Sequence, residues 1–218
     1  MTRNVKKKPA SQVRTYQGYR AMPWRNGLGS TLEIAREPAM GEDFSWRLSL
    51  ADIDHDSEFS AYSGYSRALV LVAGVSLHLR FRGHGNCLLD PTRRATRFEG
   101  EWKTRCAVPE GPCTDLSLIV RRGPAARPTS VVRAPRMLRL ESTGRMILGR
   151  DLYGALFVLD GSLAVTESIR ARPLTVRARD TLLLTPGPQR TLRLRSLEKS
   201  AAQCVLLRWR PGRAPARS

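Results

Sequence analysis

Long apolar runs are absent from this 218-residue chain. The longest candidate, Ala68–Ala73, has the length of a β-strand, whereas a membrane-spanning helix needs about 20 apolar residues. The basic start, Met1–Lys8, is followed at Pro9–Ala21 by polar residues, where a secretory signal would carry an apolar run of about 7–15 residues. We therefore expect a cytoplasmic protein with no membrane partner.

Cysteine is scarce, and its spacing excludes the common metal templates. The chain has four cysteines, Cys87, Cys106, Cys113 and Cys204, without a Cys-x-x-Cys pair, and we expect free thiols. A metal site would have to join His84 and Cys87 to Cys106 and Cys113, and these spacings match no common zinc motif. The sequence predicts no metal and no cofactor.

Acidic residues are few: 19, against 37 basic residues, which gives a net charge of +18. Such a balance makes phosphate backbones natural nonspecific partners. Most of the cations, however, are arginines that stand singly between apolar residues, as in Leu192–Arg195, and the only basic run is Lys6–Lys8. Aromatic residues make up only 6% of the chain, few for base stacking. A solvated basic surface is favoured over specific nucleic-acid binding, and nonspecific binding stays open as an alternative.

Helical periodicity is also missing, because Pro, Gly or β-branched residues interrupt every amphipathic segment longer than about two turns. Apolar residues instead alternate with polar ones in short segments bounded by Gly, Pro, Asp and Ser, which is typical of an all-β sandwich or barrel. The predicted strands are Ser30–Ala35, Ser45–Ala51, Ala68–Ala73, Ser76–Arg82, Asp115–Arg121, Met137–Leu140, Ala155–Leu159, Ser162–Thr166, Leu174–Arg177, Thr181–Leu184, Thr191–Arg195 and Cys204–Arg210.

One pattern occurs twice in the chain. An apolar strand, a glycine turn and a second strand occur at Leu69–Leu79 and again at Leu156–Val165, with the turns at Gly74 and Gly161. The Pro-containing segment 123–128 separates the two copies. We expect a flexible basic tail at 1–13, a first barrel at 14–123, a second, degenerate barrel at 130–210 and a flexible tail at 211–218.

This repeated order of strand, glycine turn and strand resembles a cupin β-barrel. Four segments of the sequence resemble one family in particular. Met22–Ile34 (MPWRNGLGSTLEI) closely resembles the opening motif of the HutD/Ves family, followed by matching blocks at Phe44–Ala51 (FSWRLSLA), Phe59–Arg67 (FSAYSGYSR) and Asp115–Gly123 (DLSLIVRRG). The resemblance implies an all-β bicupin, with two stacked jelly-roll-like barrels in one chain. Some members of the family are associated with histidine utilisation and others with environmental stress.

The chain departs from the usual residues of the family at two positions. The resemblance implies no established reaction. Arg25 stands where lysine is usual, and Ser117 where asparagine is usual. Either departure bears on the choice of ligand, since arginine offers a planar fork of donors where lysine offers a point charge. Metal-dependent cupins need converging imidazoles, but the three histidines form no His-x-His pair, and His78 shares a strand face with Arg80 and Arg82.

The opening motif contains the first group of candidate ligand-binding residues. Trp24, Arg25, Asn26 and Gly27 suit a loop at the rim of the barrel, where Trp24 covers a planar ligand and Asn26 offers donors and an acceptor. The alternative is a structural turn packed under Trp24. The family resemblance favours the ligand-binding interpretation.

A second group of candidates lies on the strands that follow. Thr31 and Glu33 share one strand face, and Arg47 and Ser49 share a face of the next strand, so Arg47 is the expected partner of Glu33 if that face looks inward. An outward cross-strand ion pair is the alternative. Trp46, Asp115 and Arg121 complete the candidates.

An arginine-lined pocket beside a carboxylate suits a small anionic metabolite that also carries a hydrogen-bond donor. The expected function is metal-free binding of a histidine-degradation intermediate, such as formylglutamate or urocanate, in a regulatory or stress-related role. An isomerase or hydrolase with Glu33 as general base and Arg47 at an oxyanion is the alternative, although no second, matched acid is evident. The second barrel is expected to support the first or to form a dimer surface, so monomer and homodimer both stay open.

Overall fold

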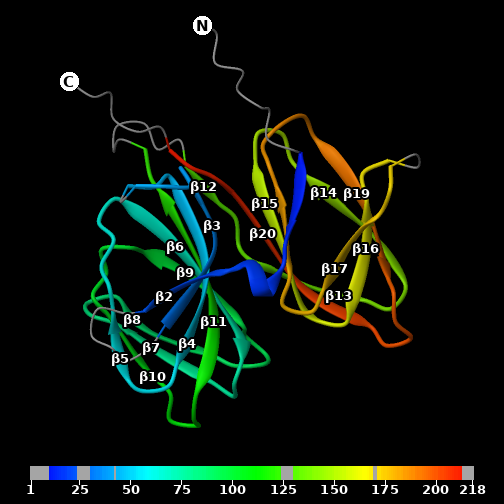
Figure 1. The fold of residues 1–218 in the computed structure, drawn as a ribbon. Helices are drawn as coiled ribbons and strands as arrows, with labels where there is room; N and C mark the ends of the chain where they lie inside the picture. Colours follow the sequence, from blue (N-terminus) through cyan, green and yellow to red (C-terminus); the bar gives the residue numbers. More distant parts are fainter. Residues whose placement is uncertain (1–9, 24–29, 42, 124–129, 169–170, 213–218) are drawn as a thin grey trace, which may run out of the picture. The chain divides into compact units, whose positions relative to one another are not determined.

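The computed structural model describes residues 10–23, 30–41, 43–123, 130–168 and 171–212 (Figure 1). These residues form strands and one 3₁₀ turn, η1 (Tyr16–Gly18), and no helix among them is long and apolar enough to cross a membrane. The chain divides into two compact units. The N-terminal unit comprises Gln17–Pro135 with the residues from Trp209 onward, and the C-terminal unit comprises the residues up to Tyr16 with Arg136–Arg208.

Two antiparallel sheets make up the N-terminal unit. The larger has the order β2 (Arg20–Pro23), β3 (Ser30–Glu37), β4 (Trp46–Ile53), β11 (Cys113–Arg121), β6 (Tyr65–Ala73) and β9 (Ala95–Glu99). The smaller has the order β5 (Ser57–Phe59), β10 (Thr104–Ala107), β7 (Leu77–Phe81) and β8 (Gly85–Leu89), and the short β12 (Val131–Val132) pairs with Trp209 and Arg210.

An apolar core joins these two sheets. Leu69 and Leu71 of β6 and Ile53 of β4 belong to one buried cluster with Leu79 and Phe81 of β7. Alternation along each strand determines which residues enter the cluster, because every second side chain of a strand points to the same face. The opposite face of the larger sheet is buried as well, and it is apolar, with Leu48 and Leu50 of β4, Leu116 and Leu118 of β11 and Val70 of β6.

The C-terminal unit repeats the arrangement of a larger and a smaller sheet. Its larger sheet has the order β1 (Ser11–Arg14), β18 (Thr181–Leu184), β15 (Tyr153–Asp160) and β20 (Ala202–Arg210), with β13 (Arg136–Leu140) also paired to β20. Its smaller sheet has the order β14 (Thr143–Leu148), β19 (Arg190–Ser196), β16 (Ser162–Thr166) and β17 (Leu174–Arg177).

The expected flexible tail at 1–13 needs correction where the structure describes it. Ser11–Arg14 forms β1, whose Val13 lies opposite Leu182 of β18, and the amide of Tyr16 donates to Asp180 Oδ1 at 2.9 Å. The segment has too few apolar residues to show alternation, but its backbone covers the edge of β18 that would otherwise lack partners. It belongs to the C-terminal unit rather than to the unit that follows it in sequence.

The all-β cupin-type fold is confirmed, and each of the twelve predicted strands coincides with a strand of the structure to within three residues at either end. Gly74 and Gly161 both have positive φ, as the two predicted glycine turns require. The pairing between described strands leaves open sheets rather than continuous closed barrels. The strands that the sequence did not predict, such as β5, β8 and β10, are short or polar and lack a clear alternation.

Candidate functional site

A cavity of about 620 Å³ lies on the inner face of the larger sheet of the N-terminal unit. The sheet provides one wall, and the segment Glu58–Tyr62, which comprises the end of β5 and the three residues after it, provides another. The lining residues are Met22, Thr31, Arg47, Ser49, Ala51, Glu58, Phe59, Ser60, Ala61, Tyr62, Arg67, Asp115, Ser117 and Ile119.

The cavity exists because the inner face of the sheet changes from apolar to polar along its strands. Leu69 and Leu71 of β6 lie in the core, and Arg67, two residues earlier on the same face, lines the cavity. In the register of the sheet, Arg47 and Arg67 are both cross-strand partners of Ile119 on β11. Two arginines from different strands therefore flank one strand at the polar end of the face.

Arg67 is the more buried of these two arginines, with 7% of its surface exposed. Its Nη2 donates to Ser117 Oγ and its Nη1 to the Ser60 carbonyl, both at 3.4 Å, while its guanidinium lies 4.9 Å from the ring centre of Phe59. Burial lowers the pKa of Arg67 to about 10, so the side chain is still cationic at neutral pH. Its Nε has no hydrogen-bond partner among the described residues.

Asp115 is the buried acid of the cavity, with 2% of its surface exposed. Burial raises its pKa to about 7; the positive charge of Arg67 offsets part of that rise, and the nearby carboxylate of Asp52 adds to it. Asp115 Oδ1 is buried and has no hydrogen-bond partner in the described part of the chain. A group of this kind can accept a hydrogen bond when ionised or donate one when protonated.

Arg47 is held at the cavity wall by aromatic rings. Its Nη2 donates to the Tyr62 hydroxyl at 2.8 Å, and its guanidinium lies 5.2 Å from the ring centres of both Tyr62 and Phe44. The guanidinium of Arg36 also lies 5.2 Å from the Phe44 ring centre. Cation–π contacts of this kind restrict where the guanidinium can point, so Arg47 is oriented before any ligand arrives.

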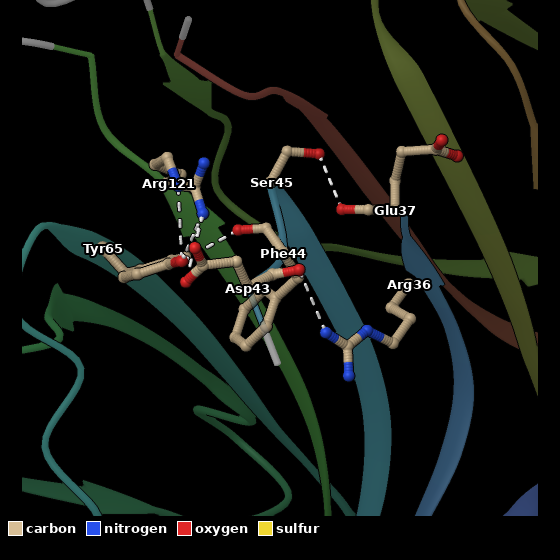
Figure 2. A network of polar contacts seen from close by, with 7 residues as sticks. All are labelled: Arg36, Glu37, Asp43, Phe44, Ser45, Tyr65 and Arg121. Carbon is tan, nitrogen blue, oxygen red and sulfur yellow. Dashed lines mark hydrogen bonds and ion pairs between the residues drawn. The ribbon is translucent and has the colours of Figure 1, made fainter. Parts of the chain in front are cut away.

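A second set of contacts anchors Phe44 itself (Figure 2). The Tyr65 hydroxyl donates to the Phe44 carbonyl at 2.8 Å and accepts from Arg121 Nη2 at 3.0 Å. Arg36 Nη2 donates to the Asp43 carbonyl at 3.2 Å on the other side of the Phe44 ring. The loop between β3 and β4 is thereby fixed to β6 and β11, and it presents Phe44 to Arg47.

Gly100 packs closely against the backbone of the cavity segment at Tyr62, so a larger residue at this position should destabilise the protein. A Cβ at this position would overlap the Tyr62 carbonyl and lie 2.9 Å from the Tyr65 carbonyl. Because both contacts are with backbone, we expect Gly100→Ala to destabilise the protein by about 1–3 kcal/mol and to lower Tm by about 3–10 °C in thermal unfolding. Gly187→Ala is the control, since no heavy atom lies within 4 Å of its added Cβ. Equal melting temperatures for the two variants would contradict this view of Gly100.

Four of the residues proposed from sequence line the cavity: Thr31, Arg47, Ser49 and Asp115. Trp24, Arg25, Asn26 and Gly27, the proposed rim loop, lie outside the described residues. Glu33 is buried on the same sheet but does not line the cavity. Its ion-pair contacts are with Arg20, at 3.6 Å, and Arg36, at 3.9 Å, rather than with the expected Arg47.

Two further expectations need correction. Trp46 does not line the cavity, because it points to the opposite face of β4 from Arg47 and packs on Trp209 with ring centres 5.0 Å apart. Arg121 does not line the cavity either, because its guanidinium binds the Tyr65 hydroxyl. The enzyme hypothesis based on Glu33 gains no support from this geometry, since its proposed base lies outside the cavity lining.

Sequence reasoning missed Arg67 and Tyr62 as site residues, whereas Ser117, noted only as a departure from the family motif that bears on ligand choice, also lines the cavity. The strand was expected to begin at Ala68, which left Arg67 outside it, whereas β6 begins at Tyr65. Extending the alternation of Leu69 and Leu71 by one step would have placed Arg67 on the inner face. Tyr62 lies outside the strands, between β5 and β6, and carries no periodic signal.

The residues of the cavity fit an anion better than a metal ion. No group of three or more His, Cys, Asp or Glu side chains among the described residues is placed to hold a metal. His78 is exposed on β7, and His84 stacks on Trp102 with ring centres 4.1 Å apart. The guanidiniums of Arg47 and Arg67 can hold a negatively charged group, while the two acids of the lining, Glu58 and Asp115, lack in the described part of the chain the further His, Cys or carboxylate ligand that a metal site needs.

These features define a cupin-type all-β protein with a cavity that contains two arginines and a buried acid. Solved structures of low identity share its fold alone, among them an oxalate decarboxylase from Lactobacillus farciminis, which is 8% identical with a TM-score of 0.59 and covers 91% of this chain and 86% of that one. The chain belongs to the HutD family, whose model matches residues 16–203.

Relatives of known sequence and structure agree with this assignment. An uncharacterized 21.2 kDa protein in the hutC 3′ region of Pseudomonas putida is 38% identical over 109 residues, which is 50% of this chain and 57% of the relative. Protein Ves from Escherichia fergusonii is 42% identical over 110 residues, which is 49% and 57%. The match thus spans less than two thirds of the length of these relatives. HutD from Pseudomonas fluorescens, solved in a formate condition, is 26% identical with a TM-score of 0.72 and covers 94% of this chain and 100% of its own.

Proposed function

We propose that this protein binds a small organic carboxylate in the cavity of the N-terminal unit and acts as a regulatory binding protein in histidine degradation. The observation that carries the proposal is the pair of arginines, Arg47 and Arg67, which stand on either side of Ile119 in the sheet. The Nε atom of each is buried and has no hydrogen-bond partner among the described residues. A carboxylate between them accepts charge-assisted hydrogen bonds, which are shorter and stronger than neutral ones.

The acid of the cavity gives the ligand a second point of recognition. Asp115 Oδ1 has no partner among the described residues, and its pKa of about 7 allows both protonation states near neutral pH. When protonated, the carboxyl group donates to a ligand oxygen; when ionised, it accepts from a ligand N–H. An acylated amino acid or an imidazole acrylate offers both kinds of group.

The size of the cavity is consistent with such a ligand. Its volume of about 620 Å³ falls within the roughly 300–1,000 Å³ of small-molecule sites. Family membership and the hutC 3′ region of the Pseudomonas putida relative support a histidine-degradation intermediate as ligand. N-formyl-L-glutamate and urocanate are the two candidates that we propose.

Isothermal titration calorimetry tests the proposal directly. We expect N-formyl-L-glutamate or urocanate to bind with a dissociation constant in the micromolar range, about −8 kcal/mol. The uncharged amide of urocanate is the matched control, and it should bind at least tenfold more weakly than urocanate because it lacks the carboxylate. Absence of heat with both acids and with formate, for a protein that shows a cooperative thermal unfolding transition, would contradict the proposal. Recovery of chemically altered ligand after incubation would show an enzyme instead.

A further inference from the structure

The outer face of the smaller sheet of the C-terminal unit carries a band of exposed arginines. The strands β14, β19, β16 and β17 form this sheet (Figure 1). Arg145 of β14, Arg193 and Arg195 of β19 and Arg177 of β17 are all exposed. We name these four residues the arginine band. It is separate from the cavity of the N-terminal unit, and the proposed function makes no use of it.

Strand register brings the members of the band together. Arg145 lies directly opposite Arg193, and Arg195 is the next residue on the same face of β19. Arg145, Arg193 and Arg195 line a surface hollow of about 620 Å³ together with the hydroxyl-bearing Thr143 and Thr166. Directly opposed residues of an antiparallel pair have Cβ atoms about 5 Å apart, and like charges at such positions destabilise the sheet.

The lack of compensating acids distinguishes this face from other arginine-bearing parts of the chain. Among the described residues, no carboxylate lies within ion-pair distance of a member of the band. In the register of the described strands, no carboxylate stands opposite a member of the band, whereas on the smaller sheet of the N-terminal unit Glu58 stands opposite Arg105. The arginine band therefore leaves its positive charge available to an external anion.

The form of the band indicates the kind of anion. Its cations extend across β14, β19 and β17 rather than closing around one point, so the arrangement suits repeated negative charges. The outward residues of these strands include no aromatic side chain, which leaves no platform for base stacking. We infer that the arginine band binds the phosphodiester backbone of a nucleic-acid strand without reading its sequence.

The test uses the full-length chain and a fluorescein-labelled strand of 20 thymidine nucleotides, with binding followed by fluorescence anisotropy at several NaCl concentrations. Arg145→Gln/Arg193→Gln/Arg195→Gln should lower the affinity at 50 mM NaCl at least tenfold. It should also reduce the slope of log K against log[NaCl] by about 2, because each phosphate contact with a single strand contributes about 0.7. The substitutions are on an exposed face, and circular dichroism checks that the fold is retained.

The matched control removes three exposed arginines from the other unit: Arg80→Gln/Arg82→Gln/Arg105→Gln. This variant has the same net charge and should lose less than threefold in affinity. Equal losses in the two variants would overturn the inference, because binding would then follow net charge alone. Failure of the wild-type protein to bind the strand would overturn it as well. Competition by inorganic phosphate at micromolar concentration, with no dependence on strand length, would show a small phosphate site instead. None of these outcomes depends on ligand binding in the cavity.

Discussion

Replacing Arg67 with methionine should weaken the binding of N-formyl-L-glutamate at least hundredfold in calorimetry at pH 6. Arg67 is buried and cationic in the cavity, and it would donate charge-assisted hydrogen bonds to the ligand carboxylate. Each such bond contributes about 1.5–3 kcal/mol, and 1.4 kcal/mol corresponds to a factor of ten, so loss of two bonds accounts for the expected effect. Methionine fits the same space between Phe59 and Phe98 without a charge.

Arg80→Met is the matched control for this prediction. Arg80 is an exposed arginine of β7 in the same unit and does not line the cavity. We expect less than a threefold change in affinity for this variant. A comparable loss in both variants would show that the cavity does not discriminate between these arginines, and our view of the site would then be wrong.

Raising the pH from 6 to 8 should weaken the binding of the same ligand to the wild-type protein about tenfold. Burial raises the pKa of Asp115 to about 7, so this carboxyl group loses its proton within the range. A bound carboxylate is repelled by the ionised form and favours the protonated form, so affinity falls up to tenfold for each pH unit above the pKa. The pKa of Arg67, about 10, keeps its charge constant, and burial raises the pKa of Cys113 to about 12, so its thiol stays neutral.

Asp115→Asn should remove this pH dependence, because asparagine keeps the size and a donor but does not titrate. We expect its affinity to change less than twofold between pH 6 and pH 8, and at pH 8 to exceed that of the wild-type protein. Asp160→Asn, at an exposed position of the C-terminal unit, should leave the wild-type profile unchanged. If Asp115→Asn retains the tenfold decrease, another group is responsible for it.

The fold was accessible from sequence because alternation of apolar and polar residues is a local property. The inner positions of β4, where Arg47 and Ser49 precede Ala51, could be read in the same way, and so could Asp115 on β11. The environment of Glu33 could not, because the register between β3 and β4 shifts between Glu33 and Ala35. This shift places Arg36, rather than Ala35, opposite Arg47, and no periodic pattern reveals an irregularity of one residue.

Arg67 and Tyr62 show a different difficulty. Arg67 lies one residue before an obvious apolar run, and its burial depends on Phe59 and Phe98, which come from separate strands. Tyr62 contacts Arg47 from a turn that Gly100 supports across the fold. Contacts between distant segments decide both positions, and composition and spacing carry no information about them.

The residues up to Tyr16 belong to the C-terminal unit, and those from Trp209 onward belong to the N-terminal unit. The protein therefore cannot be divided into its two units by a single cut of the chain. A fragment ending at Gly123 would lose Trp209, whose ring is fully buried against Trp46. A fragment starting at Ser130 would lose β1 and expose the edge of β18. Each half would be incomplete when produced alone, whereas the two produced together could restore each other, so fragment complementation rather than simple truncation is the way to study the units apart.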